Sequence, residues 1–338
     1  MLSFVRIAAL AAVSGALTVL GATAPVSAQT VELKLSHFVP PKHAFHLWAT
    51  EWAQTLEKES GGRIKITIYP NGQLVGPPNR QFDAARNGIT DIAFSLHGVT
   101  PGRYAMTELA NLPFTWPKAG SSPAITGKRM SELAPQYLHA EHQGLRVLFM
   151  TAASPIVSFS KVAVRKLDDY KGLKIRYAGV QSRHLIDALG AVPMLVPPPE
   201  SQDALSKGIV DAAWFPHEAG LAYDLGSVVK YAIEPGLATA TFAMVMNPAK
   251  YNALPADLKA LIDKHSGVAA GESFGKVWEV AEKHGREILI KKGLEIVTLP
   301  QADVEAMRKR MQPHVESAIA ALEKKGQPAR TFYEAYIK

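Results

Sequence analysis

The chain has 338 residues, of which 47% are hydrophobic, and its 37 basic and 30 acidic side chains give a net charge of +7. It contains no cysteine, which excludes disulfides, thiol nucleophiles and cysteine-bound metal or iron–sulfur sites. The basic residues form only short pairs such as Lys291-Lys292, so nucleic-acid binding is not expected. The modest positive excess favours anionic ligands or anionic surfaces.

The segment 1–28 has the pattern of a secretory signal peptide. It carries one charge at Arg6, an apolar run from Ile7 to Leu20 and a small-x-small site that ends at Ala28. We therefore expect export and cleavage near Ala28. An uncleaved anchor is the alternative, but the run is short for a bilayer span and rich in small residues.

The remainder, from Gln29, exceeds the ~100–200 residues typical of one domain, so two lobes are expected. Period-two and helical patterns alternate along its first part. The expected elements are a strand over 31–36, a helix over 43–59, a strand over 64–68, a helix over 78–86 and a strand over 91–95. Alternating strands and helices predict parallel pairing and an α/β lobe.

Two loops follow the carboxyl ends of these strands, where open α/β sheets bind ligands. The Gly- and Pro-rich loop 96–104 contains His97 and Arg103, which are candidate ligand contacts. His37 and His43 flank the first strand-to-helix turn and are further candidates for the cleft.

The chain is expected to cross between lobes twice. A strand over 145–150 closes the first lobe, and a crossing near 151–155 leads into a second lobe. The strands expected in that lobe lie around 156–159, 173–177 and 210–214. The chain then returns near Ala240 to a buried strand over 241–246. Two crossings form a hinge, which supports closure around a ligand.

The helical pattern from Ala256 to about Lys292 is almost continuous and too long for one small lobe. Further helices are expected from Ala302 onward, and resemblance to a known family, described below, implies that they pack on the second lobe. The match Gly271-Glu272-Ser273-Phe274-Gly275 lies inside the long helical pattern, not at the strand-to-helix turn of a nucleophile elbow. We interpret it as a chance match whose glycines allow close helix packing.

Arg176 is predicted near the carboxyl end of a short strand, because Leu173, Ile175 and Tyr177 alternate with polar residues and a helical pattern follows over 184–189. A guanidinium stays charged when desolvated and matches a carboxylate bidentately. On strand position alone, a salt bridge to a neighbouring acid explains the residue better.

The segment 159–176, which ends in Asp168-Asp169-Tyr170-Lys171-Gly172-Leu173-Lys174-Ile175-Arg176, resembles the signature segment of DctP-type solute receptors of tripartite ATP-independent periplasmic (TRAP) transporters. The similarity continues at 61–66, 188–191 and 204–211 and covers nearly the whole mature chain. The resemblance implies a two-lobed α/β periplasmic binding protein with parallel-rich sheets, a hinge and a long lobe-spanning helix. It also implies that Arg176 clamps the substrate carboxylate.

The resemblance further implies a periplasmic receptor that delivers a small organic acid to small and large membrane subunits. We expect a monomer without cofactor or metal. The expected lobes are 29–152 with 241–280, and 153–240 with 281–338.

The sequence departs from the family pattern at two polar positions. A second Arg that many members carry falls near Pro155, and an Asn falls at Phe215. We therefore expect a more apolar pocket that stacks on a flat ligand and takes an aromatic or otherwise apolar monocarboxylate. Core packing explains Trp214 and Phe215 equally well. The candidate ligand-binding residues are Arg176, Trp214, Phe215, His217, His97, Arg103, His37 and Ser154.

Catalytic and metal motifs are otherwise absent. The sequence lacks a phosphate-binding Gly-x4-Gly-Lys-Ser/Thr loop and a Gly-x-Gly-x-x-Gly fingerprint after the first strand. The pairs His43/His46 and His139/His142 match no zinc signature, and surface or loop histidines are expected. The alternative functions are a secreted enzyme with His97 or His217 as base, distinguished by ligand turnover, and a ligand-sensing module, distinguished by its signalling partner.

Overall fold

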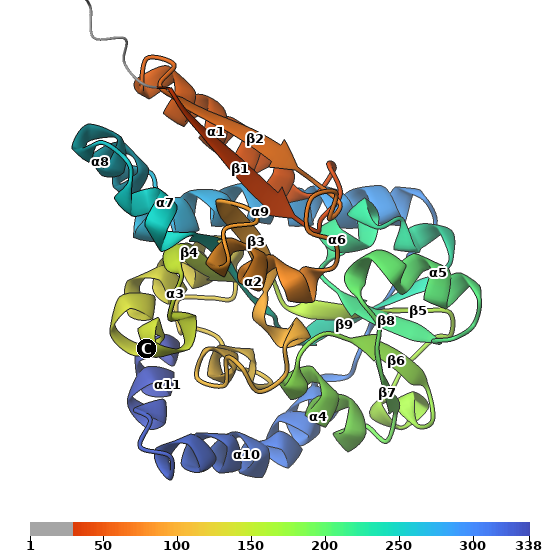
Figure 1. Cartoon of the computed structure of the whole chain (residues 1–338). Helices are drawn as coiled ribbons and strands as arrows, with labels where there is room; N and C mark the ends of the chain where they lie inside the picture. Colours follow the sequence, from red (N-terminus) through yellow and green to blue (C-terminus); the bar gives the residue numbers. More distant parts are fainter. Residues whose placement is uncertain (1–29) are drawn as a thin grey trace, which may run out of the picture.

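A computed structural model describes residues 30–338, so the predicted signal peptide lies outside the described residues. Its first sheet has five strands, and its second has six (Figure 1). The first sheet runs in the order β2 (Ile64–Tyr69), β1 (Val31–His37), β3 (Ile92–Leu96), β10 (Thr241–Met246) and β4 (Arg146–Ala152). Strand β1 pairs in parallel with β2 and β3, whereas β10 is antiparallel to both of its neighbours. The surrounding helices include α1 (Ala44–Glu59), α2 (Gln81–Arg86) and α3 (Pro123–Tyr137).

The second sheet is also mixed. Its order is β11 (Glu295–Thr298), β9 (Tyr231–Ala238), β5 (Ile156–Ser160), β8 (Ala212–Phe215), β6 (Lys174–Tyr177) and β7 (Val192–Leu195). Strand β5 is antiparallel to β8 and β9, and the remaining pairs are parallel. The helices that follow its strands are α4 (Val180–Ala188), α5 (Ser201–Ser206) and α6 (His217–Ala222). The predicted two-lobed α/β class is confirmed, with two antiparallel insertions in otherwise parallel sheets.

The chain passes between the sheets at two short connections. Strand β4 ends at Ala152 and β5 begins at Ile156, and β9 ends at Ala238 and β10 begins at Thr241. The expected crossings near 151–155 and Ala240 fall in these connections. Because each crossing strand continues almost directly into the other sheet, the two sheets are joined by extended chain.

A long helix packs against elements of both lobes. After α7 (Pro248–Asn252), the expected helix 256–292 is divided into α8 (Ala256–Lys264) and α9 (Gly267–Lys291). Gly267 has a φ of 62°, a left-handed value that ends regular helix geometry. Helix α9 contacts α1, α3 and β4 on one lobe and α6 on the other (Figure 1).

The glycines of the Gly-x-Ser-x-Gly match pack α9 against α3. A Cβ at Gly271 would lie 2.5 Å from the Gly127 carbonyl oxygen, and one at Gly275 would lie 2.2 Å from that of Pro123. These positions therefore allow the two helix backbones to touch, as predicted.

The C-terminal helices differ from expectation. Helix α10 (Gln301–Glu323) contacts α4 of the second lobe, but α11 (Ala329–Ile337) packs against α3. Phe332 and Tyr336 are fully buried in a cluster with Met130 and Leu133 of the first lobe. The expected placement of 281–338 in the second lobe therefore does not hold for α11, because the apolar face of this helix completes the first lobe's core. The end of α10 joins the same core cluster through Val315, Ile319 and Leu322.

Short 3₁₀ segments connect these elements. They are η1 (Pro78–Arg80), η2 (His97–Val99), η3 (Thr107–Asn111), η4 (His139–His142), η5 (Leu167–Tyr170), η6 (Pro198–Glu200) and η7 (Leu225–Ser227).

Candidate functional site

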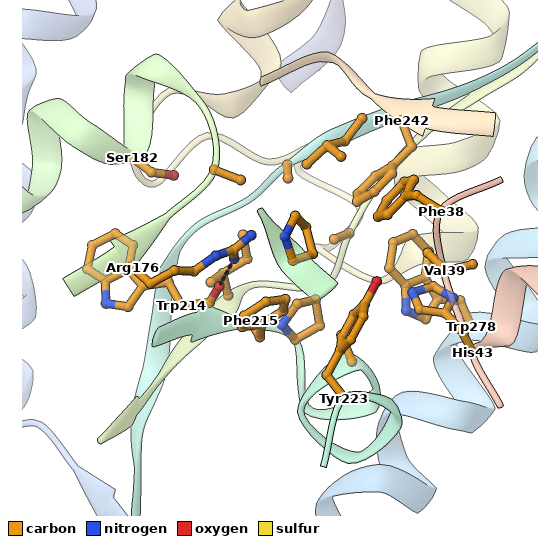
Figure 2. A pocket seen from close by; sticks show the side chains of 18 residues that line it. Phe38, Val39, His43, Arg176, Ser182, Trp214, Phe215, Tyr223, Phe242 and Trp278 are labelled. Atoms are coloured by element: carbon orange, nitrogen blue, oxygen red, sulfur yellow. Dashed lines mark hydrogen bonds between the residues drawn. The ribbon is translucent and has the colours of Figure 1, made fainter. Parts of the chain in front are cut away.

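A cavity lies between the two lobes and is lined by both of them (Figure 2). The first lobe contributes residues that follow the carboxyl ends of β1 and β3 and the start of β10. The second contributes the end of β6, the β8–α6 segment and the end of α6. The lining residues are Phe38, Val39, His43, Leu96, Ala153, Ile156, Arg176, Ala178, Ser182, Pro198, Trp214, Phe215, Pro216, Ala219, Tyr223, Ala240, Phe242 and Trp278.

Among the described residues, Arg176 is the one Arg or Lys side chain that lines this cavity, and only 2% of it is exposed. Its Nε donates to the Val196 carbonyl at 2.9 Å, and its Nη1 donates to the Trp214 carbonyl at 3.0 Å. Nη2 is buried without a hydrogen-bond partner. Burial lowers the pKa of Arg176 to about 9, so the group remains charged at neutral pH.

No carboxylate pairs with Arg176 within the described chain, so the salt-bridge interpretation does not hold. The two backbone carbonyls fix the plane of the guanidinium and leave one nitrogen for another partner. A buried charge that lacks one of its hydrogen bonds is unfavourable. An anion in the cavity would relieve that cost.

The Phe215 ring packs against the face of the same guanidinium. The Arg176 Cζ lies 4.0 Å from the centroid of the Phe215 ring, a cation–π arrangement. Trp214 precedes Phe215 on β8, and alternate strand residues point to opposite faces. The two rings accordingly join different core clusters, so they both pack in the core and border the cavity.

The opposite wall is aromatic and comes from the first lobe and α9. The Phe242 and Trp278 rings meet edge to face with centroids 5.4 Å apart, and Phe242 stacks on Phe94 at 5.5 Å. Phe38 and Val39, which directly follow β1, extend this wall (Figure 2). Such a surface suits a flat apolar ligand body.

Tyr223 caps α6 and lines the cavity with a buried hydroxyl that has no hydrogen-bond partner. Its ring is tilted against Phe215 at a centroid distance of 5.6 Å. Burial raises the pKa of the phenol above its ordinary value, so the hydroxyl keeps its proton. Tyr223 was not among the residues predicted from the sequence.

His43 borders the cavity and contacts Glu218 of the other lobe. The Phe45 amide donates to His43 Nδ1 at 3.1 Å, so the imidazole proton is on Nε2, which lies 3.4 Å from Glu218 Oε2. Burial lowers the pKa of His43 to about 3 and raises that of Glu218 to about 8. Both groups are therefore mainly neutral at pH 7, and Arg176 dominates the charge of the cavity.

Glu218 also links the two lobes by accepting a hydrogen bond from the N-terminus of helix α1. Its Oε1 accepts from the Ala44 amide at the start of α1 at 2.8 Å. The N-terminus of its own helix is capped by Glu282 of α9, which accepts from the amides of His217 and Glu218 at 2.8 Å each. Two helix N-termini thus have a buried carboxyl partner from another element.

The lobes also touch directly at a pair of glycines. A Cβ at Gly98, after β3, would lie 2.5 Å from Gly179 Cα and 2.8 Å from Gly179 N, at the start of α4. The buried state of Arg176, Phe215 and Trp278 agrees with this contact. The structure therefore has a closed cleft.

Three of the eight candidate residues line the cavity, namely Arg176, Trp214 and Phe215. The other five lie outside the lining. His37 Nε2 pairs with His46 Nδ1 at 3.0 Å, His97 bonds Thr241 and His142 at 3.1 Å, and His217 Nε2 bonds Glu234 at 2.8 Å. Arg103 forms two bonds with Asp83, and Ser154 is buried beside the lining residue Ala153.

Several histidines are buried rather than at surface or loop positions, because each side chain has a polar partner inside the fold; they include His37, His43 and His142. Of the two that were expected near the cleft, His43 lines the cavity and His37 does not. Within residues 30–338, no group of three or more His, Cys, Asp or Glu side chains is arranged to hold a metal ion. The same part of the chain has no helix long and apolar enough to cross a membrane.

Comparison with known proteins identifies the family. The family model for bacterial extracellular solute-binding protein, family 7 (DctP), matches residues 35–321. The C4-dicarboxylate-binding periplasmic protein DctP of Rhodobacter capsulatus is 25% identical over 269 residues, which cover 78% of this chain and 79% of the relative.

Two solved structures are similar over almost the whole chain. A TRAP solute-binding protein of Rhodoferax ferrireducens, in complex with copurified benzoate, is 30% identical with a TM-score of 0.86 and 91% and 96% coverage of this chain and that one. A TRAP solute-binding protein of Bordetella bronchiseptica, with bound (R)- and (S)-mandelate, is 30% identical with a TM-score of 0.83 and coverages of 90% and 97%. The chain therefore belongs to the DctP family and is a solute receptor of the TRAP type, a class of extracytoplasmic proteins that bind small acids and work with membrane subunits.

Proposed function

We propose that this receptor captures an aromatic or otherwise apolar monocarboxylate. The observation that carries the proposal is the buried Arg176 Nη2, which lacks a partner in a cavity walled by aromatic rings. A ligand carboxylate would satisfy this nitrogen with a charge-assisted hydrogen bond. The ligand body would then lie against Phe215, Phe242 and Trp278.

A second carboxylate has no comparable partner. From the part of the chain that the structure describes, the cavity lining receives no Lys and no Arg other than Arg176, and Arg103 is paired with Asp83 outside it. Because an unpaired buried charge is costly, a dicarboxylate would bind less well than a monoacid of similar size. The bound aromatic acids of similar receptors, namely benzoate, mandelate and 3-hydroxybenzoate, support this ligand class.

We assign roles at the ligand site to three of the residues that were predicted from the sequence. Arg176 holds the carboxylate, Phe215 fixes the guanidinium and borders the ligand, and Trp214 supplies the carbonyl that orients Nη1. His37, His97, Arg103, Ser154 and His217 are not given ligand contacts in this proposal because they lie outside the cavity lining.

We further propose binding without chemical turnover. The two histidines considered as bases for an enzyme, His97 and His217, both lie outside the cavity lining. Both ring nitrogens of His97 are bonded to Thr241 and His142, and Nε2 of His217 is bonded to Glu234, so we place neither of them where it could take a proton from a ligand in the cavity. Recovery of the intact acid after prolonged incubation supports the receptor, whereas a converted acid would support the enzyme.

The proposed mature protein begins near Gln29, is periplasmic and is monomeric. Cleavage after Ala28 is supported by the small-x-small site at the end of the apolar run. Intact mass of protein recovered from the periplasm tests the cleavage position, and light scattering of that protein tests the monomer.

A thermal-unfolding screen of the mature chain tests the ligand class, with benzoate, a short aliphatic monoacid and a C4 dicarboxylate as probes. A ligand present at a hundred times its Kd stabilises the native state by about 2.7 kcal/mol. We expect benzoate to raise the unfolding midpoint most. Arg176→Ala should abolish the shift, whereas Arg103→Ala, which removes an arginine outside the cavity, should preserve it. A shift with the dicarboxylate alone would contradict the proposed ligand class.

A further inference from the structure

The cavity holds a second buried polar group that the clamp does not use. The Tyr223 hydroxyl is buried, unpartnered and directed into the cavity (Figure 2). A hydroxyl left without a partner in an apolar site loses its hydrogen bonds to water without replacement. Because this hydroxyl lies among the lining residues, we expect the ligand to place a polar group next to it.

The ligand carboxylate is not the best match for this hydroxyl. Arg176 enters from β6, and Tyr223 enters from the end of α6, on the side where Figure 2 shows Val39, His43 and Trp278. No hydrogen bond joins Tyr223 and Arg176, and the Phe215 ring packs against both of them. An acid held at Arg176 would thus present its ring, not its carboxylate, to Tyr223.

Among residues 30–338, no group forms a hydrogen bond with the Tyr223 hydroxyl. Phe38, Val39 and Phe242 are apolar, and His43 uses Nδ1 for the Phe45 amide while its Nε2 faces Glu218. A phenol that keeps its proton both donates and accepts. It therefore matches a ligand hydroxyl, which also does both.

We propose that Tyr223 binds a hydroxyl group on the ligand ring, so that this receptor selects hydroxylated aromatic monocarboxylates over their unsubstituted parents. This inference rests on the proposed function, because it requires the carboxylate to be held at Arg176. It adds a specificity-determining residue at the other end of the same cavity.

Titration calorimetry with benzoate, its three monohydroxy isomers and the three matching methylbenzoates tests the inference on the unmutated chain and on Tyr223→Phe. We expect at least one hydroxybenzoate to bind more tightly than both benzoate and its methyl counterpart. Tyr223→Phe should weaken that isomer about five- to thirty-fold and change benzoate affinity less than about two-fold.

Three other outcomes would each contradict the inference, and they can be told apart. Equal weakening of benzoate and hydroxybenzoates would assign Tyr223 to the carboxylate. Unchanged affinity for every hydroxybenzoate in Tyr223→Phe would show that no contact is made. Binding of none of these acids by the unmutated chain would remove the proposed function as well. If Tyr223→Phe does not fold, the comparison of hydroxy- with methylbenzoates on the unmutated chain decides the question.

Discussion

Arg176 is bound by the protein at two of its three guanidinium nitrogens. Two backbone carbonyls and one aromatic ring orient the guanidinium, and the third nitrogen remains without a partner. Burial already lowers its pKa to about 9. The planar group tolerates this site because its charge is delocalised and weakly hydrated, which a lysine ammonium does not share.

Arg176→Lys should make ligand binding strongly dependent on pH. Comparable burial lowers a lysine pKa from about 10.4 by roughly 3 units, so the ammonium would lose its charge between about pH 6 and 8. Only the charged form attracts a carboxylate, and affinity should therefore fall as pH rises through this range. Benzoate titrations at pH 6, 7 and 8 measure the effect. The unmutated receptor is the control and should vary little below pH 8; parallel profiles for the two proteins would contradict the argument.

At the scale of single elements, the N-termini of helices α1 and α6 take part in the contact between the two lobes. Helix α6 donates two backbone hydrogen bonds to Glu282 and presents Glu218 to the first turn of α1. The Glu218 carboxyl is buried, so its charged form is disfavoured, and its pKa rises to about 8. A neutral carboxyl still accepts from the Ala44 amide.

Glu218→Gln should become stabilising relative to the unmutated chain as pH rises. The folded pKa of about 8 exceeds the ordinary value of 4.5, so the favourable contribution of Glu218 is complete below 4.5 and is lost as pH rises toward 8. Glutamine does not titrate, so the gap in unfolding free energy should move in its favour by at most about 1.4 kcal/mol per pH unit. Urea unfolding at pH 5, 6.5 and 8 measures this gap. Glu272 of α9, replaced by Gln, is the control, because its partner Lys276 lowers its pKa rather than raising it, and it should not show this trend. A constant gap for Glu218→Gln would refute the prediction.

In the closed molecule, the two lobes meet at a pair of loop glycines, Gly98 and Gly179, which have no side chains. Gly98 and Gly179 follow β3 and β6, the strands that lead to the two sides of the cavity. The close approach of their backbones lets Arg176 face the aromatic wall in a buried space. Any Cβ at Gly98 would meet backbone atoms, which cannot move aside as a flexible side chain would.

Gly98→Ala should therefore hinder closure while leaving each lobe folded. We expect benzoate affinity to fall about ten-fold or more, as for a loss of 1.4 kcal/mol, with the ligand-free unfolding midpoint nearly unchanged. Small-angle scattering with saturating ligand should give a larger radius of gyration than for the unmutated receptor. Thr100→Ala, which removes one hydrogen bond to His97 in the same loop, is the matched control. An identical ligand-bound radius in Gly98→Ala would exclude the glycine contact as a determinant of closure.

The sequence alone predicted the local elements and the residues at their ends. Period-two patterns located β1, β2, β3, β5 and β6, and Arg176 lies at the carboxyl end of β6 as expected. Strand β9 was missed because Glu234-Pro235-Gly236 favours a turn, whereas the structure accommodates it in an irregularity opposite β5. The long helical pattern was correct except for its interruption at 265–266.

Which buried groups face one another was decided by the tertiary structure alone. His97 follows a strand end as expected, yet its ring turns to Thr241 and His142, while Tyr223, Phe242 and Trp278 meet at the cavity from distant segments. The same applies to α11, whose apolar face fits the first lobe. Periodicity records that a side chain is buried on one face of its own element, but it contains no information about the neighbouring element. The resemblance already implied a ligand-binding role for Arg176, but the buried guanidinium nitrogen without a partner, which supports the proposed role, is seen only when all the surrounding groups are in place.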